Sequence, residues 1–157
     1  MSEESAPRRP WIAPVVRVPA PSLEVGLQRS DEFLVADRLL TDVGGSIGVA
    51  VLSTPGMVAM MERNAARLAL AHLPEGQATV GFEICVRHVA AALEGARCTV
   101  HASLSEIVNG RKLRFAVEVR ERPQSDGDPA ATGRLIGVGT HERRVIDVAQ
   151  HARSAGG

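Results

Sequence analysis

The stretch from Ser53 to His72 limits the possible folds of this chain more than any other. It reads S-T-P-G-M-V-A-M-M-E-R-N-A-A-R-L-A-L-A-H, and its apolar residues recur with the period of a helix. A hydroxyl at Thr54 followed by Pro55 is typical of a helix start, and Pro74 and Gly76 mark its end. The pattern predicts one long buried helix, about 28 Å in length. The residues on its apolar face are Met57, Val58, Met61, Ala65, Leu68 and Ala69.

Outside this helix the apolar residues recur with a period of two, which is typical of half-buried strands. The alternation predicts a strand around residues 32–40 before the helix, and strands at 79–89, 97–108, 113–119 and 135–148 after it. Asn109-Gly110 predicts a hairpin turn. Within 79–89 the predicted inward row is Val80, Phe82, Ile84, Val86 and His88.

These elements predict an α+β fold in which an antiparallel sheet wraps around one central helix, because the sheet must bury its apolar face and one long helix can cover it. This is the hotdog architecture. Residues 1–22 contain five prolines and are predicted to form a flexible or extended arm. Residues 23–148 form the predicted domain, and 149–157 a small polar tail.

The composition argues against several kinds of partner. Eighteen basic and 18 acidic residues give no net charge, which argues against nucleic-acid binding. No apolar run approaches a membrane span, and the polar N-terminus lacks a signal core. Cys85 and Cys98 form no C-x-x-C pair, which argues against a zinc site. We therefore expect a cytoplasmic protein that uses no metal.

Glu62 and His88 are the candidate catalytic residues. Glu62 lies at the edge of the apolar stripe and away from Arg63 and Arg67. Partial burial makes a carboxylate a better base or nucleophile near neutral pH. His88 ends the inward row of a strand that must pack on the helix, so we expect the two side chains to act as an acid–base pair. The plain alternatives are a surface glutamate and a core histidine.

Other polar positions have simpler interpretations. Thr54 is explained by helix capping alone, and Gly81 by a bulge or by the close approach of a ligand. For His141 the plain interpretation is the polar face of an edge strand, and Glu142 is expected on such a face. The glycine-rich stretch 41–50 lacks the spacing of a phosphate-binding loop and is expected to be a mobile connection or a lid.

Three blocks occur in order along the chain: T-P-G-M-V-A-M-M-E, V-G-F-E-I-C-V-R-H and I-G-V-G-T-H-E-R-R-V-I-D. Together they resemble the hotdog acyl-CoA thioesterases related to fluoroacetyl-CoA thioesterase, over about residues 23–148. The resemblance implies a catalytic set of Thr54, Glu62 and His88. It also implies that Gly81 lies near the acyl group, that Arg143 supports the site, and that two subunits form the site at a dimer interface.

The resemblance fails just before the helix, where Gly44-Gly45-Ser46-Ile47-Gly48-Val49 stands in place of bulky aromatic residues. This difference argues against selectivity for a fluorinated two-carbon acyl group and favours a larger one.

We therefore expect hydrolysis of an acyl thioester on coenzyme A or on a carrier protein, with coenzyme A as part of the substrate and no other cofactor. Gly56 and Gly81 are the expected amide donors to the developing oxyanion. The alternatives are a hotdog hydratase or dehydratase and a non-catalytic binder of acyl thioesters. The sequence leaves open whether Glu62 is a base or a nucleophile.

Overall fold

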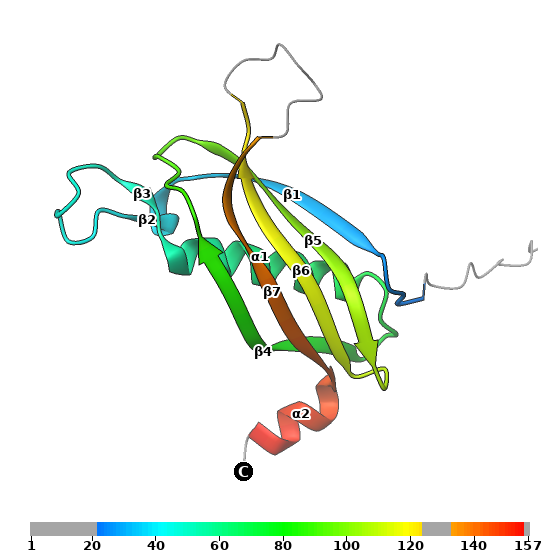
Figure 1. The fold of residues 1–157 in the computed structure, drawn as a ribbon. Helices are drawn as coiled ribbons and strands as arrows, with labels where there is room; N and C mark the ends of the chain where they lie inside the picture. Colours follow the sequence, from blue (N-terminus) through cyan, green and yellow to red (C-terminus); the bar gives the residue numbers. More distant parts are fainter. Residues whose placement is uncertain (1–21, 124–132, 156–157) are drawn as a thin grey trace, which may run out of the picture.

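The computed structural model describes residues 22–123 and 133–155. The predicted arm at 1–22 therefore lies almost entirely outside the described residues. Five strands form one antiparallel sheet in the order β1-β5-β6-β7-β4 (Figure 1). They are β1 (Gln28–Leu34), β4 (Gln77–His88), β5 (Arg97–Val108), β6 (Lys112–Glu121) and β7 (Arg134–Asp147). Within the described residues β1 and β4 are the two edges of this sheet.

The central helix α1 (Thr54–Leu70) crosses one face of the sheet, as Figure 1 shows. Its buried side includes Met57, Met61 and Leu68, which join one core cluster with the inward residues of β5 and β6. In β5 the alternation that predicts a strand at 97–108 is confirmed, because its every second residue, Cys98, Val100, Ala102 and Leu104, is buried. The sheet wraps around one helix, so the predicted hotdog architecture is confirmed.

The segment before α1 differs from the prediction of one strand at 32–40. The first strand ends at Leu34, and a short 3-10 helix η1 (Asp37–Leu39) follows. Asp37 has a φ of 51°, which no strand accommodates. A small hairpin of β2 (Leu40–Thr41) and β3 (Val51–Leu52) then leads into the helix, and the glycine-rich stretch forms the loop between its two strands.

The predicted boundaries of the other elements are close to those observed. The helix is shorter than the predicted 53–72, since it ends at Leu70. The hairpin at Asn109-Gly110 is confirmed, and both residues adopt positive φ angles, which favour Asn and Gly. Residues 148–155, most of them in the predicted tail, form a second helix, α2 (Val148–Ala155), which continues from the end of β7 (Figure 1).

One irregularity in β4 determines which of its side chains face α1. The pairing with β7 shifts between Gly81 and Glu83, so Phe82 is an extra residue in a β-bulge. The predicted inward positions of Val80 and Phe82 are therefore wrong, since Val80 lies between Thr79 and Gly81 and pairs with Arg144 on the outer face. The Phe82 side chain is 63% exposed and its ring stacks under Arg144 on the outer face. Before the bulge Thr79 and Gly81 face the helix; after it Ile84, Val86 and His88 do.

Candidate active site

Thr54 and His88 meet where α1 begins and β4 ends. The hydroxyl Oγ1 of Thr54 lies 3.0 Å from Nδ1 of His88. The other ring nitrogen, Nε2, is buried and has no hydrogen-bond partner among the described residues. The imidazole is thus fixed by one nitrogen, and the other nitrogen remains free to bond a substrate, as in a general acid or base.

The predicted capping role of Thr54 is wrong, because Ser53 caps the helix. The Oγ of Ser53 accepts a hydrogen bond from the backbone N–H of Gly56 at 3.0 Å. This contact leaves the Thr54 hydroxyl available to His88. It also engages the Gly56 amide, so the expectation that Gly56 donates to an oxyanion does not hold.

Glu62 lies two turns further along α1 and faces β4 and β7. A Cβ atom placed on Gly81 would lie 2.6 Å from Oε1 of Glu62, so any other residue there would require this carboxylate to shift. The side chain of Glu62 is 43% exposed, which keeps it reachable by a substrate. The predicted proximity of Gly81 to the site therefore has a direct structural reason.

Arg143 approaches the Glu62 carboxylate from the same side as Gly81, since a Cβ on Gly81 would lie 3.8 Å from its Nη1. Its Nη1 is 4.0 Å from Oε1 of Glu62, at the outer limit of an ion pair. Its Nε donates to Oγ1 of Thr79 at 2.8 Å, and its Nη2 donates to the Thr79 carbonyl at 3.0 Å. Burial lowers the pKa of Arg143, and the Glu62 carboxylate partly opposes that shift.

His141 is the site residue that the sequence interpretation missed. The expectation of a polar edge-strand position is wrong, because its side chain is 1% exposed on an inner strand and faces α1. Its Nε2 lies 2.9 Å from Nη1 of Arg143 and 3.7 Å from Oε1 of Glu62. The spacing of His141 and Arg143 was an available signal, since residues two apart in a strand share one face.

Glu142, between these two residues, points to the opposite face. Its carboxylate pairs with Lys112, Arg114 and Arg144 on the outer side of the sheet. Glu142 therefore lies on the polar outer face as predicted, but the predicted edge position is wrong, because β7 lies between β6 and β4.

Within one chain the residues form two separate groups. Thr54 with His88 makes one, and Glu62 with Gly81, His141 and Arg143 makes the other. Thr54 and Glu62 are eight residues apart, about 12 Å along the helix axis. In the described part of the chain, no hydrogen bond or ion pair joins Glu62 to His88, so the expected acid–base pair is not formed within a single copy.

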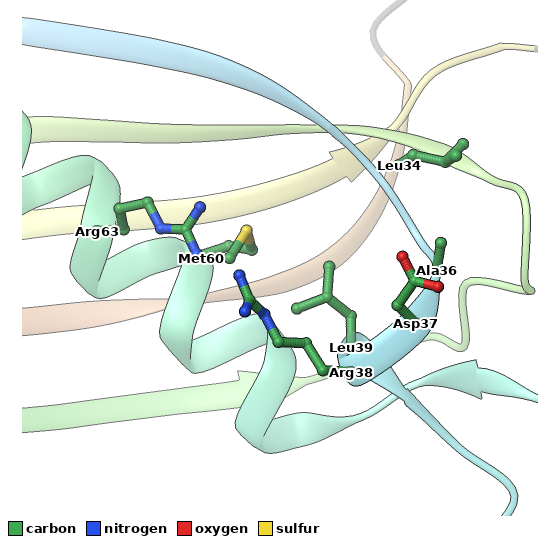
Figure 2. Close-up of a pocket in the computed structure, with 7 residues that line it drawn as sticks. All are labelled: Leu34, Ala36, Asp37, Arg38, Leu39, Met60 and Arg63. Atoms are coloured by element: carbon green, nitrogen blue, oxygen red, sulfur yellow. The ribbon is translucent and has the colours of Figure 1, made fainter.

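A cavity of about 470 Å³ opens on the opposite flank of α1, between the helix, η1 and the end of β1 (Figure 2). Figure 2 shows Arg38 and Arg63 extending toward each other beside Met60. The lining residues are Leu34, Ala36, Asp37, Arg38, Leu39, Met60 and Arg63. None of the predicted site residues lines this cavity, so it is a separate feature.

In residues 22–123 and 133–155, no group of three His, Cys, Asp or Glu side chains is arranged to hold a metal ion. Across the same residues, no helix combines the length and apolar character needed to cross a membrane.

The comparison with known families agrees with the fold and with the order of the motifs. The family model described as fluoroacetyl-CoA-specific thioesterase matches residues 35–149. The chain belongs to the fluoroacetyl-CoA-specific thioesterase family. The match covers α1 and the strands that carry both groups of site residues.

Relatives of this family support the same placement. The fluoroacetyl-CoA thioesterase of Streptantibioticus cattleyicolor is 36% identical over 96 residues, which span 61% of this chain and 61% of that protein's length. A solved structure of the fluoroacetyl-CoA thioesterase is 30% identical, with a TM-score of 0.68 over 85% of this chain and 96% of the other. A thioesterase superfamily member from Thermus thermophilus is 27% identical, with a TM-score of 0.68 over 87% of this chain and 90% of the other.

Proposed function

We propose that this protein hydrolyses an acyl thioester, carried by coenzyme A or by a carrier protein, to a free acid and a thiol. The observation that carries the proposal is the buried, unpartnered Nε2 of His88, held in place through Nδ1 by Thr54. A ring nitrogen fixed in this way can transfer a proton to the leaving thiolate or take one from water. No cofactor beyond the substrate's own coenzyme A is proposed.

Glu62 is the proposed partner in this chemistry, by one of two routes. As a base it removes a proton from water, which attacks the thioester carbon while the carbon–sulfur bond breaks. As a nucleophile its oxygen forms a bond to that carbon, the thiolate leaves with a proton from His88, and water then hydrolyses the resulting anhydride. In either case the bulge beside Gly81, which leaves backbone groups outside the strand ladder, is the proposed source of an oxyanion donor.

A homodimer would bring the two groups together. β4 is an edge strand, and its free backbone groups can pair with a second copy. Antiparallel pairing centred between Ile84 and Cys85 would place Gly81 of one chain opposite the partner's His88. A twofold interface then forms two equivalent sites, each with Glu62 from one chain and Thr54 and His88 from the other.

The loop between β2 and β3 bears on the acyl group. In place of large side chains it has three glycines and the exposed aliphatic residues Val43, Ile47 and Val49. The glycines fill less space than aromatic side chains would before α1, so we propose a substrate with an acyl group larger than a two-carbon one. The proposed location is the cytoplasm.

The experiment that tests the proposal measures thiol release from a panel of acyl-CoAs of increasing chain length, including aromatic ones, and from one acyl carrier protein thioester. Wild type is compared with Glu62→Gln and with the control Glu75→Gln, an exposed glutamate just beyond α1. We expect Glu62→Gln to lower kcat/KM about 100-fold or more while the control retains wild-type activity.

Release that persists in Glu62→Gln would remove Glu62 from the chemistry. Binding of acyl-CoA without release of thiol from any substrate would favour the non-catalytic binder. Loss of water from a hydroxyacyl thioester, or addition of water to an enoyl thioester, would favour the dehydratase or hydratase. For the dimer, light scattering and a short bis-maleimide reaction at Cys85 are decisive. A monomer that does not cross-link at micromolar concentration would contradict the shared site.

A further inference from the structure

Both ring nitrogens of the buried His141 are engaged. Nδ1 lies 2.9 Å from the carbonyl oxygen of Glu83, which follows the bulge in β4. Nε2 lies 2.9 Å from Nη1 of Arg143. The ring therefore bridges the bulged strand and the arginine that faces Glu62.

These two neighbours require one protonation state. A backbone carbonyl only accepts hydrogen bonds, so Nδ1 must carry the proton and donate it. A guanidinium only donates, so Nε2 must be unprotonated and accept from Arg143. An imidazolium would direct an N–H at a guanidinium N–H, and the Nε2–H tautomer would do the same. The geometry selects the neutral Nδ1–H form alone.

The contact to His141 completes the anchoring of Arg143. Thr79 holds Nε and Nη2, and His141 holds Nη1, which is the nitrogen nearest to Glu62. Nη1 and the imidazole Nε2 both lie within 4.0 Å of Oε1 of Glu62, and Gly81 borders all three groups, since a Cβ there would lie 3.5 Å from the His141 ring and 3.8 Å from Nη1. Without an acceptor at the position of Nε2, Nη1 would lose this hydrogen bond, and only the two contacts to Thr79 and the 4.0 Å approach to Glu62 would hold the guanidinium plane.

We propose that His141 is a positioning residue, which through its Nε2 acceptor holds the Arg143 guanidinium against the carboxylate of Glu62. This inference rests on the proposed thioesterase reaction, because it assigns His141 a part in orienting the group that attacks or activates water. His141 itself exchanges no proton with the substrate. A small displacement of a charged partner from a reacting group is enough to lower a rate about 100-fold.

Four variants test the role. His141→Phe keeps a ring of similar size and removes the acceptor, and His141→Gln supplies a carbonyl oxygen near the position of Nε2. Arg143→Gln removes the guanidinium, and His101→Gln is a control at a histidine on β5 that bonds Ser30 instead. We expect His141→Phe to lower kcat by tenfold or more with a smaller change in KM, His141→Gln to recover most of that loss, and the control to match wild type.

The decisive measurement is a double-mutant cycle. If His141 acts through Arg143, adding His141→Phe to Arg143→Gln lowers kcat by less than about twofold further, because the contact is already absent. Independent, additive losses would overturn the proposal, as would a folded His141→Phe with wild-type kcat.

Nitrogen NMR of the histidine side chains gives a readout that needs no activity and applies even where His141→Phe does not fold. We expect the His141 signals, assigned by their loss in His141→Gln, to show a proton on Nδ1 and none on Nε2. A proton on Nε2 would overturn the proposal. Absence of hydrolysis in wild type would refute the proposed function instead, while the tautomer would still report on the contact to Arg143.

Discussion

The hydroxyl of Thr54 lies 3.0 Å from the ring of His88, while the hydroxyl of Ser53, one position earlier, caps α1. Ser53 immediately precedes the helix, and Thr54 is its first residue. Two neighbouring hydroxyls therefore have different tasks. One satisfies a free amide at the end of α1, and the other fixes the orientation of an imidazole on β4. This separation allows the stability of the helix and the chemistry of the site to be tested independently.

We predict that Thr54→Val lowers kcat/KM at least tenfold with little change in the free energy of unfolding, since Ser53 still caps the helix. Ser53→Ala should do the reverse, with a loss of about 1 kcal/mol in stability from the missing cap and a much smaller loss of activity. Urea unfolding and thiol-release kinetics on both variants check this. Equal loss of activity in the two variants would show that Thr54 acts only through the helix.

Gly81→Ala should abolish most activity although it changes no polar group. Its Cβ would lie 2.6 Å from Oε1 of Glu62, so the carboxylate must move away from Arg143. Ala71→Ser, an exposed position just beyond the end of α1, is the control and should retain wild-type kcat/KM. A fully active Gly81→Ala would mean that the position of Glu62 beside the bulge does not matter for the reaction.

Stability should fall on mild acidification because of His141. Burial lowers the pKa of this ring, the charge of Arg143 adds to the shift, and the Glu83 carbonyl and Glu62 oppose it. The unfolded chain takes up a proton near pH 6.5, while the folded ring takes it up only at lower pH. The stabilisation of the folded protein by the neutral His141 ring is therefore complete above pH 6.5. It is lost as the pH falls from there through the pKa of the folded ring.

Urea unfolding of wild type and His141→Gln between pH 8 and 5 tests this window. Below about pH 6.5 the free energy of unfolding of wild type should fall more steeply than that of the variant, which lacks the titrating ring. Asp31, whose pKa is lowered chiefly by its hydrogen bond from Arg29, acts in a separate pH window, below the ordinary aspartate pKa of 3.8. A pH-independent difference would show that the folded ring accepts a proton as readily as the unfolded one.

The two cysteines should differ in reactivity. Cys98 is fully buried, and burial raises its pKa to about 11, so it has neither access nor thiolate at neutral pH. Cys85 is exposed and pairs with Thr140 on β7. A disulfide reagent should therefore titrate one thiol in the native protein and two in denaturant. Fast reaction of both thiols in the native state would contradict the packing of β5.

The helix, the sheet and the hairpin were predictable from the sequence because each depends on local periodicity or on turn chemistry. The inward row of β5 alternates without interruption, so reading every second residue gave the right core. The first strand was not predictable in the same way. Phe33, Leu34, Leu39 and Leu40 look like one apolar run, and only the backbone turn at Asp37 divides it.

The site was predicted in part. Glu62 and Arg143 lie together and so do Thr54 and His88, but the division into two groups depends on distances that spacing in one chain does not reveal. His141 was missed because a histidine between polar neighbours reads as exposed. Its burial depends on the sheet order, since β4 rather than β7 is the edge.

The bulge at Phe82 also changes how related sequences should be compared. Gly81 and His88 are seven positions apart, an odd number, and in a regular strand they would face opposite sides of the sheet. The single extra residue lets both face α1. A chain that lost one residue between them could keep both side chains on that face only by losing the bulge as well. The number of residues between these two positions and the presence of the bulge therefore have to change together. An alignment that places a gap here without removing the bulge would pair residues from opposite faces of the sheet.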